Sequence, residues 1–114
     1  MNAFRLLLGV IFGVIVVYTA FVAMEHGLGP FGVFFGDIAE GGWPGQFNLD
    51  FMGMLVLSGF WMAWRNNFTL GGLVLGVGGL LFGAPILTLY LFILSQQTNG
   101  DVKRMLLGDR RAAA

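Results

Sequence analysis

Cysteine is absent from this chain, and charged residues make up only 11% of it. The first absence excludes disulfides, thiolate chemistry and zinc or iron–sulfur sites with cysteine ligands. Ordinary globular chains are about 25% charged. A soluble domain of this size has a large surface for its volume, and so few charges would leave much of that surface uncovered. We therefore expect apolar surface to face lipid or a partner.

The charges are also balanced and poorly placed for catalysis. Six basic and six acidic residues leave no net charge, which gives no electrostatic reason to expect a nucleic-acid partner. The two-histidine helix motif of metalloproteases is missing from the sequence. No ionisable side chain lies in the middle of an apolar run, which weakens an interpretation as a proton pump or ion transporter. We expect a protein that is not an enzyme.

Long hydrophobic runs dominate the chain, and 57% of its residues are apolar. About 20 helical residues span the roughly 30 Å hydrocarbon core of a bilayer. The runs therefore predict a single membrane domain, residues 1–114, with transmembrane helices over about 6–24, 48–65 and 69–95. Pro85 should kink the third of these helices. The expected fold class is an all-α integral membrane protein.

The first run could be mistaken for a cleaved signal peptide. It is longer than the usual apolar region of about 7–15 residues, and no small-x-small pattern precedes Glu25. We interpret it as an uncleaved membrane anchor.

Amphipathic segments flank the predicted spans. Residues 30–40 carry bulky apolar side chains at helical spacing, which predicts a short helix lying in the membrane interface. The tail, residues 100–114, is expected to be a second short amphipathic segment. Tryptophan is typical of the membrane interface. The expected interfacial side chains are Phe31, Phe34, Phe35, Ile38, Trp43, Trp61 and Trp64.

Small residues recur at helical spacing in all three runs. In lipid, such residues let helix backbones approach closely. The expected helix-packing positions are Gly9, Gly13, Gly59, Ala63, Gly72, Gly76, Gly79 and Gly83. The last four form a stripe, for which we expect a close contact within the chain or with another protein. A lipid, quinone or carotenoid bound in a groove beside this stripe is the alternative.

Acidic residues gather between the first two runs, and basic residues gather in the tail. The candidate polar site consists of Glu25, His26, Asp37, Glu40 and Asp50. With three spans, this loop would share a membrane face with Lys103, Arg104, Arg110 and Arg111. Mutual attraction or simple solvation is the plain interpretation. A cation or proton site made by His26 with two carboxylates, or a metallated pigment bound by His26, is the sharper one. We expect an interface histidine and no bound metal.

Several phrases within residues 30–110 are distinctive. They are VFFGDI at 33–38, WPGQFNLDF at 43–51, WMAWR at 61–65 and GAP at 83–85. Together they resemble a group of small bacterial inner-membrane proteins with three hydrophobic helices. The resemblance implies a location in the bacterial inner membrane and no known activity, so it assigns no catalytic or binding residue.

The expected function is a non-catalytic accessory subunit of a larger membrane complex, respiratory or photosynthetic. Its partners would be membrane lipids and other transmembrane helices. Alternatives are binding of an apolar small molecule and a homo-oligomeric small transporter. Arg5 before the first run and Arg65 after the second predict a cytoplasmic N-terminus, and a third span then places the C-terminus outside. A plain count of Lys and Arg favours the opposite orientation.

Overall fold

The computed structural model describes residues 1–113, and every regular element in that part of the chain is a helix. The helices are α1 (Asn2–His26), α2 (Pro30–Glu40), α3 (Trp43–Arg65), α4 (Leu70–Phe82), α5 (Ala84–Gln97), α6 (Val102–Leu107) and α7 (Asp109–Ala112). The all-helical part of the expected fold class is therefore confirmed. Within residues 1–113, α1 is the one helix that is both long and apolar enough to cross a membrane. A signal sequence near an N-terminus meets the same criterion.

Proline and polar caps explain where several helices begin. Each of the three prolines lies in the first turn of a helix, in α2, α3 and α5, where its missing N–H costs nothing. The Thr69 hydroxyl accepts a hydrogen bond from the Gly72 N–H at the start of α4. The Asp101 carboxylate accepts one from the Arg104 N–H at the start of α6. Both are ordinary N-caps.

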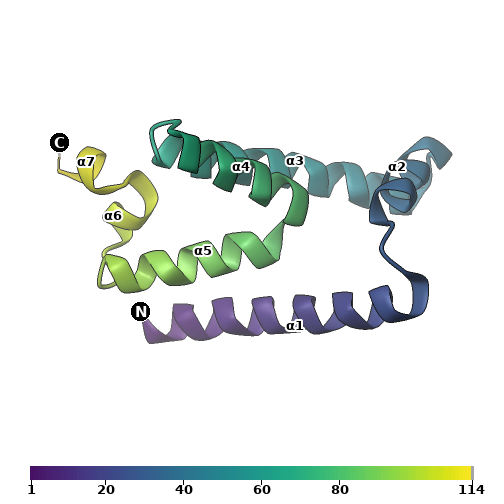
Figure 1. The fold of residues 1–114 in the computed structure, drawn as a ribbon, viewed down its shortest axis with the longest axis horizontal. Coiled ribbons are helices and arrows are strands. Elements are labelled where there is room, and N and C mark those ends of the chain that lie inside the picture. Colours follow the sequence, from purple (N-terminus) through teal and green to yellow (C-terminus); the bar gives the residue numbers. More distant parts are fainter. Residues whose placement is uncertain (114) are drawn as a thin grey trace.

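The predicted third transmembrane helix is wrong as a single element, because the chain reverses between α4 and α5 (Figure 1). The Tyr90 hydroxyl lies 2.8 Å from Asn66 Nδ2, although a continuous helix would place these residues about 30 Å apart. Gly83 makes the reversal with φ 66° and ψ −132°, a conformation that suits glycine. Pro85 then begins a new helix instead of kinking an old one.

The reversal leaves two short helices. α4 has 13 residues and α5 has 14, so each is about 20 Å long, shorter than the roughly 30 Å of a bilayer core. Together they form a helical hairpin that begins and ends at the same end of the molecule (Figure 1). α3 has 23 residues and is therefore about 35 Å long, whereas the longest extent of the molecule is 48 Å.

The helices form an elongated bundle of 48 × 27 × 24 Å. α3 and α4 form the most extensively packed pair, and α5 lies between this pair and α1 (Figure 1). α2 packs on α3 at one end, while α6 and α7 cover the other. Arg5 Nη2 donates to the Ser95 carbonyl oxygen at 2.8 Å, so the start of α1 meets the end of α5. Both ends of the chain therefore lie at the same end of the bundle, whereas three spans would separate them.

The α3–α4 interface depends on small residues. A Cβ on Gly59 would lie 2.6 Å from the Gly76 carbonyl oxygen, and one on Gly76 would lie 2.8 Å from the Gly59 carbonyl oxygen. Ala63 packs on Gly76 from the same side, and the end of the Met62 side chain fills the space above Gly79. The two backbones are therefore in direct contact, as small residues permit in membrane helices.

Few apolar side chains are buried inside the chain. The buried hydrophobic side chains of the described residues are Leu8, Met62, Ala63, Leu94 and Met105. α1 packs chiefly against α5, and only 6% of its most apolar stretch is buried. Most of the apolar surface of α1 is thus exposed.

Candidate functional site: the basic end of the bundle

The acidic residues predicted as a polar site do not form one. Glu25 and His26 approach each other at 3.9 Å, but both side chains are more than 70% exposed. Asp37 reaches Asn48 at 3.5 Å, and Glu40 and Asp50 are exposed. Among residues 1–113, no three side chains of the metal-binding types lie close enough to hold an ion. The described residues therefore bring no two carboxylates together with His26.

The acidic loop and the basic tail lie at opposite ends of the bundle, which contradicts the expectation that they share a face. Figure 1 shows α2 at one end and α6 and α7 at the other. The hairpin at Gly83 is the reason, because it returns the chain to the end where α1 begins. All six Lys and Arg residues belong to this end, in the first turns of α1, the last turn of α3, α6 and α7. We call it the basic end.

Three arginines of the basic end bind backbone carbonyls at the C-terminal ends of helices. Arg5 donates to the carbonyl of Ser95 in α5. Arg65 Nε donates to the Met105 carbonyl of α6 at 2.6 Å, and Arg111 Nη1 donates to the Trp64 carbonyl of α3 at 2.7 Å. The last carbonyls of a helix have no partner within it and carry partial negative charge. The carbonyls of Ser95 and Trp64 also accept from the N–H groups of Gly100 and Asn67, so the arginines there add a second donor. Arg65 and Arg111 hold the tail against the bundle.

The aromatic side chains expected at the membrane interface have varied surroundings. Trp61 Nε1 donates to the Leu106 carbonyl at 2.9 Å, and the Arg111 guanidinium lies 4.0 Å from the centre of the Trp64 ring, a cation–π contact. Both tryptophans therefore contact the tail. Trp43 is 72% exposed at the other end. On α2, Phe31 and Phe35 are exposed, whereas Phe34 and Ile38 are half-buried.

The predicted packing glycines fall into three groups. Gly59, Ala63, Gly72, Gly76 and Gly79 lie at the α3–α4 interface or its edge. Gly83 forms the hairpin turn, where Phe51 and Leu55 of α3 pack against it. Gly9 and Gly13 face open space, because a Cβ on either would meet nothing within 4 Å.

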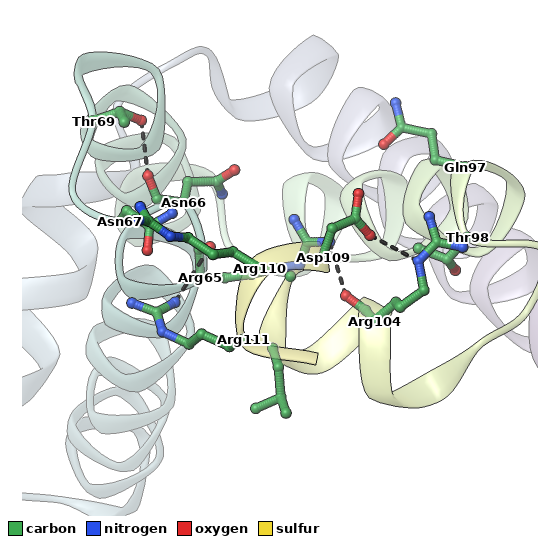
Figure 2. Close-up of a pocket in the computed structure, with 12 residues that line it drawn as sticks. Arg65, Asn66, Asn67, Thr69, Gln97, Thr98, Arg104, Asp109, Arg110 and Arg111 are labelled. Atoms are coloured by element: carbon green, nitrogen blue, oxygen red, sulfur yellow. Dashed lines mark hydrogen bonds and ion pairs between the residues drawn. The ribbon is translucent and has the colours of Figure 1, made fainter. Parts of the chain in front are cut away.

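A polar pocket of about 410 Å³ opens at the basic end (Figure 2). It lies between the α3–α4 turn, the end of α5, and α6 with α7. Its lining residues are Arg65, Asn66, Asn67, Thr69, Gln97, Thr98, Arg104, Leu107, Gly108, Asp109, Arg110 and Arg111. Four arginines and one aspartate thus surround the pocket, together with amide and hydroxyl groups.

One ion pair joins two of the residues that line this pocket. Arg104 Nε donates to Asp109 Oδ1 at 2.7 Å (Figure 2). This hydrogen bond, and then the positive charge of Arg104, hold the pKa of Asp109 below its ordinary value. The same partner raises the pKa of Arg104. Both groups therefore stay charged near neutral pH, and Asp109 neutralises one of the four arginines.

Comparison with protein-family models, with curated proteins and with solved structures finds no match. Guanidinium groups around an open pocket suit the binding of an anion. The hydroxyls of Thr69 and Thr98 donate instead to the carbonyls of Asn66 and Leu94.

Sequence reasoning missed the residues that organise the basic end. Tyr90 accepts hydrogen bonds from Arg65 Nη1 at 3.1 Å and Asn66 Nδ2 at 2.8 Å. In the sequence, Tyr90 is an isolated polar group in an apolar run, and Arg65 is a single charge beside two tryptophans. For Tyr90 and Arg65, the sequence offers one indication, which is that polar groups buried in membrane helices need hydrogen-bond partners. Which partners they have depends on the hairpin, and the pattern of apolar residues does not reveal that turn.

Proposed function

We propose that this chain is a multi-pass membrane protein that acts as a non-catalytic accessory subunit of a larger membrane complex. α1 and α3 would cross the bilayer, and the α4–α5 hairpin would enter it from the basic end. The observation that carries the proposal is the uncovered apolar surface of α1.

That surface is continuous along one side of the helix. The side chains of Leu6, Val10, Val14, Val17 and Phe21 recur at helical spacing, and each is more than half exposed. Contiguous apolar surface on this scale is typical of contacts with a membrane or another protein. Lipid alone would suffice to cover it.

The open glycines of α1 favour a protein partner as well as lipid. Gly9 and Gly13 are separated by about one helical turn, and a Cβ on either would meet nothing within 4 Å. The equivalent pattern on α3 and α4 is already filled by direct backbone contact. A second helix could therefore pack on α1 at Gly9 and Gly13 as α4 packs on α3.

The charge distribution supports one orientation. Lys and Arg prefer the cytoplasmic side of a membrane, and all six lie at the basic end. We therefore place the basic end in the cytoplasm, with α2 on the opposite face. A bacterial inner membrane fits this placement and stays part of the proposal.

Native mass spectrometry after purification in a gentle detergent tests the subunit proposal. Wild-type protein is expected in a heteromeric complex, and Gly9→Leu with Gly13→Leu should release it because two large side chains block the approach. Gly71→Leu is the matched control, since Gly71 is exposed and also open. A wild-type protein that is monomeric, or that forms only homo-oligomers, would contradict the proposal.

An apolar ligand is a second candidate function, favoured by a separate groove. A cavity of about 520 Å³ lies between α2, α3 and α4. Its lining residues are Pro30, Phe31, Phe34, Phe35, Phe51, Met52, Leu55, Leu80 and Leu81. It differs from the groove expected beside the glycine stripe, because α3 fills that stripe. A lipid, quinone or carotenoid retained by the wild type, and lost on Phe34→Ala with Phe51→Ala, would support this candidate.

A further inference from the structure

The pocket at the basic end has more positive charge than the chain itself neutralises. Of its four arginines, Arg104 is paired with Asp109, and Asp109 is the one carboxylate among the lining residues. The carbonyls bound by Arg65 and Arg111 carry partial charge only. Both of these arginines are half-buried, where like charges repel more strongly than in water. An excess of three positive charges in an open pocket favours a bound anion.

The chemistry of the donors suits a phosphate group. A guanidinium group can bind phosphate oxygens through two parallel hydrogen bonds. Within residues 1–113, neither the Arg104 nor the Arg110 guanidinium donates to a backbone carbonyl, and Arg104 donates to Asp109. Thr69, which caps α4, lies on the pocket wall. It brings the positive N-terminal end of a 13-residue helix to the same place.

The place of the pocket favours a phosphate carried by a lipid. In the orientation proposed above, it opens at the cytoplasmic membrane surface, where anionic lipids attract basic segments. On the neighbouring α6, Val102 is 55% exposed and Leu106 is 49% exposed. These apolar side chains are placed to enter the outer part of the acyl region while arginines remain at headgroup level.

We propose that this pocket binds the phosphate group of an anionic ligand, for which the headgroup of an anionic phospholipid is the favoured source. The lipid source rests on the proposed membrane function, whereas the phosphate chemistry does not. Arg65 and Arg111 shape the pocket through their carbonyl contacts. Arg104 and Arg110 supply the charge that the ligand neutralises.

The test measures binding of defined probes to the purified full-length chain in a neutral detergent. The probes are phosphatidylglycerol, phosphatidylcholine and inorganic phosphate, and dissociation constants come from native mass spectrometry or fluorescence titration. Wild-type protein should prefer phosphatidylglycerol to phosphatidylcholine at least tenfold, and the affinity should fall as salt is added.

Matched variants assign this preference to the pocket. Arg104→Gln with Arg110→Gln should weaken phosphatidylglycerol binding about tenfold or more, because each removes a charge from the wall. Lys103→Gln removes the same charge from the same segment but not from the pocket lining, so its affinity should stay within about twofold. Circular dichroism checks that each variant is folded. The single variant Arg110→Gln, at an exposed position, gives a second measurement if the double variant does not fold.

The probes separate the two sources of phosphate. If the protein prefers phosphatidylglycerol and millimolar inorganic phosphate does not displace it, the ligand is the lipid headgroup. Inorganic phosphate that binds alone and competes fully assigns a soluble phosphate compound. Equal binding of both lipids without phosphate binding, or equal affinity of wild type and double variant, overturns the inference. Resistance to alkaline extraction from membranes tests the membrane function separately, so either proposal can fail without the other.

Discussion

Glycine has three different roles in this chain, although the sequence pattern suggested one. Gly76 lies in direct backbone contact with α3, and Gly83 adopts a positive φ at the hairpin turn. A Cβ on Gly9 or Gly13 would meet nothing within 4 Å. Spacing alone identifies which glycines share a helical face while the helix continues. It does not show where the helix stops, because that depends on the conformation of Gly83.

The two central glycines of the α3–α4 interface should respond differently to a methyl group. A Cβ on Gly76 meets the Gly59 carbonyl, part of a rigid backbone, whereas one on Gly79 meets the end of the flexible Met62 side chain. Gly76→Ala should therefore lower the free energy of unfolding by about 1–3 kcal/mol, and Gly79→Ala by less. Thermal or denaturant unfolding in detergent measures both.

The control for this pair is Gly71→Ala. Gly71 is exposed on the same helix and has open space around it, so alanine there should be neutral or stabilising by up to about 1 kcal/mol. A Gly76→Ala variant as stable as the Gly71→Ala variant would show that α3 and α4 are not in backbone contact.

The Arg104–Asp109 pair predicts a titration shift that one substitution should remove. The pKa of Asp109 lies below its ordinary value because Arg104 donates a hydrogen bond to the carboxylate and adds its positive charge. The contribution of the pair to stability is then fully present above the unfolded pKa and is lost as the pH falls through the folded pKa. In Arg104→Gln, the pKa of Asp109 should rise toward its ordinary value, as measured by NMR of the carboxyl carbon. An unchanged pKa would show that the two groups are not paired in solution.

At the scale of elements, the sequence predicted the helices better than their connections. The first two apolar runs correspond to α1 and α3, and residues 30–40 coincide with α2. Hydrophobic periodicity and proline positions carry this information locally. The third run was predicted as one kinked helix because Pro85 was considered without Gly83. A proline alone kinks a helix, but a glycine with positive φ two residues earlier lets the chain turn back on itself.

The hairpin can be tested by a disulfide in a chain that has no cysteine of its own. A Cβ on Gly78 would lie 4.0 Å from Ile86 Cγ2, whereas a continuous helix would place the two residues about 12 Å apart along its axis. Gly78→Cys with Ile86→Cys should therefore cross-link under mild oxidation, as detected by mass spectrometry of the intact protein.

The control pair moves one cysteine to the far end of α4. Gly71→Cys with Ile86→Cys keeps the same α5 position but places its partner two helical turns away, so it should remain reduced. Equal cross-linking of both pairs would point to a mobile hairpin, and no cross-linking of either would favour a single continuous helix.

For the molecule as a whole, one reversal changes the side on which every later residue lies. The sequence identifies the acidic loop and the basic tail correctly as separate clusters. Whether the two clusters lie on the same side depends on how many times the chain crosses the molecule between them. The hairpin alters that number by one. This is why the same residues predicted a shared face, whereas the structure places α2 and α6 at opposite ends. It is also why the pocket at the basic end, which needs α3, α5 and the tail together, was not foreseen.

The same reversal predicts a single membrane orientation. In the sequence alone, the positions of Arg5 and Arg65 favour one orientation and the plain count of Lys and Arg favours the other. If α1 and α3 cross the bilayer and the hairpin returns to the basic end, all six Lys and Arg lie on one side, which the positive-inside preference assigns to the cytoplasm. The absence of cysteine allows single-cysteine labelling of intact cells with a membrane-impermeant maleimide. Glu40→Cys, at the end of α2, should be labelled from outside. Lys103→Cys, in α6, should be labelled only after the membrane is permeabilised.

A cytoplasmic reporter fused after residue 114 should be active by the same argument, and a periplasmic reporter there should be silent. Two other results would each identify a different error. Labelling of Lys103→Cys but not Glu40→Cys in intact cells would keep the hairpin and reverse the orientation, so the six charges would not set the topology. Labelling of both from the same side would place the tail on the face of α2. The third run would then cross the membrane as one helix, and the pocket between α3, α5 and the tail would not exist in the bilayer.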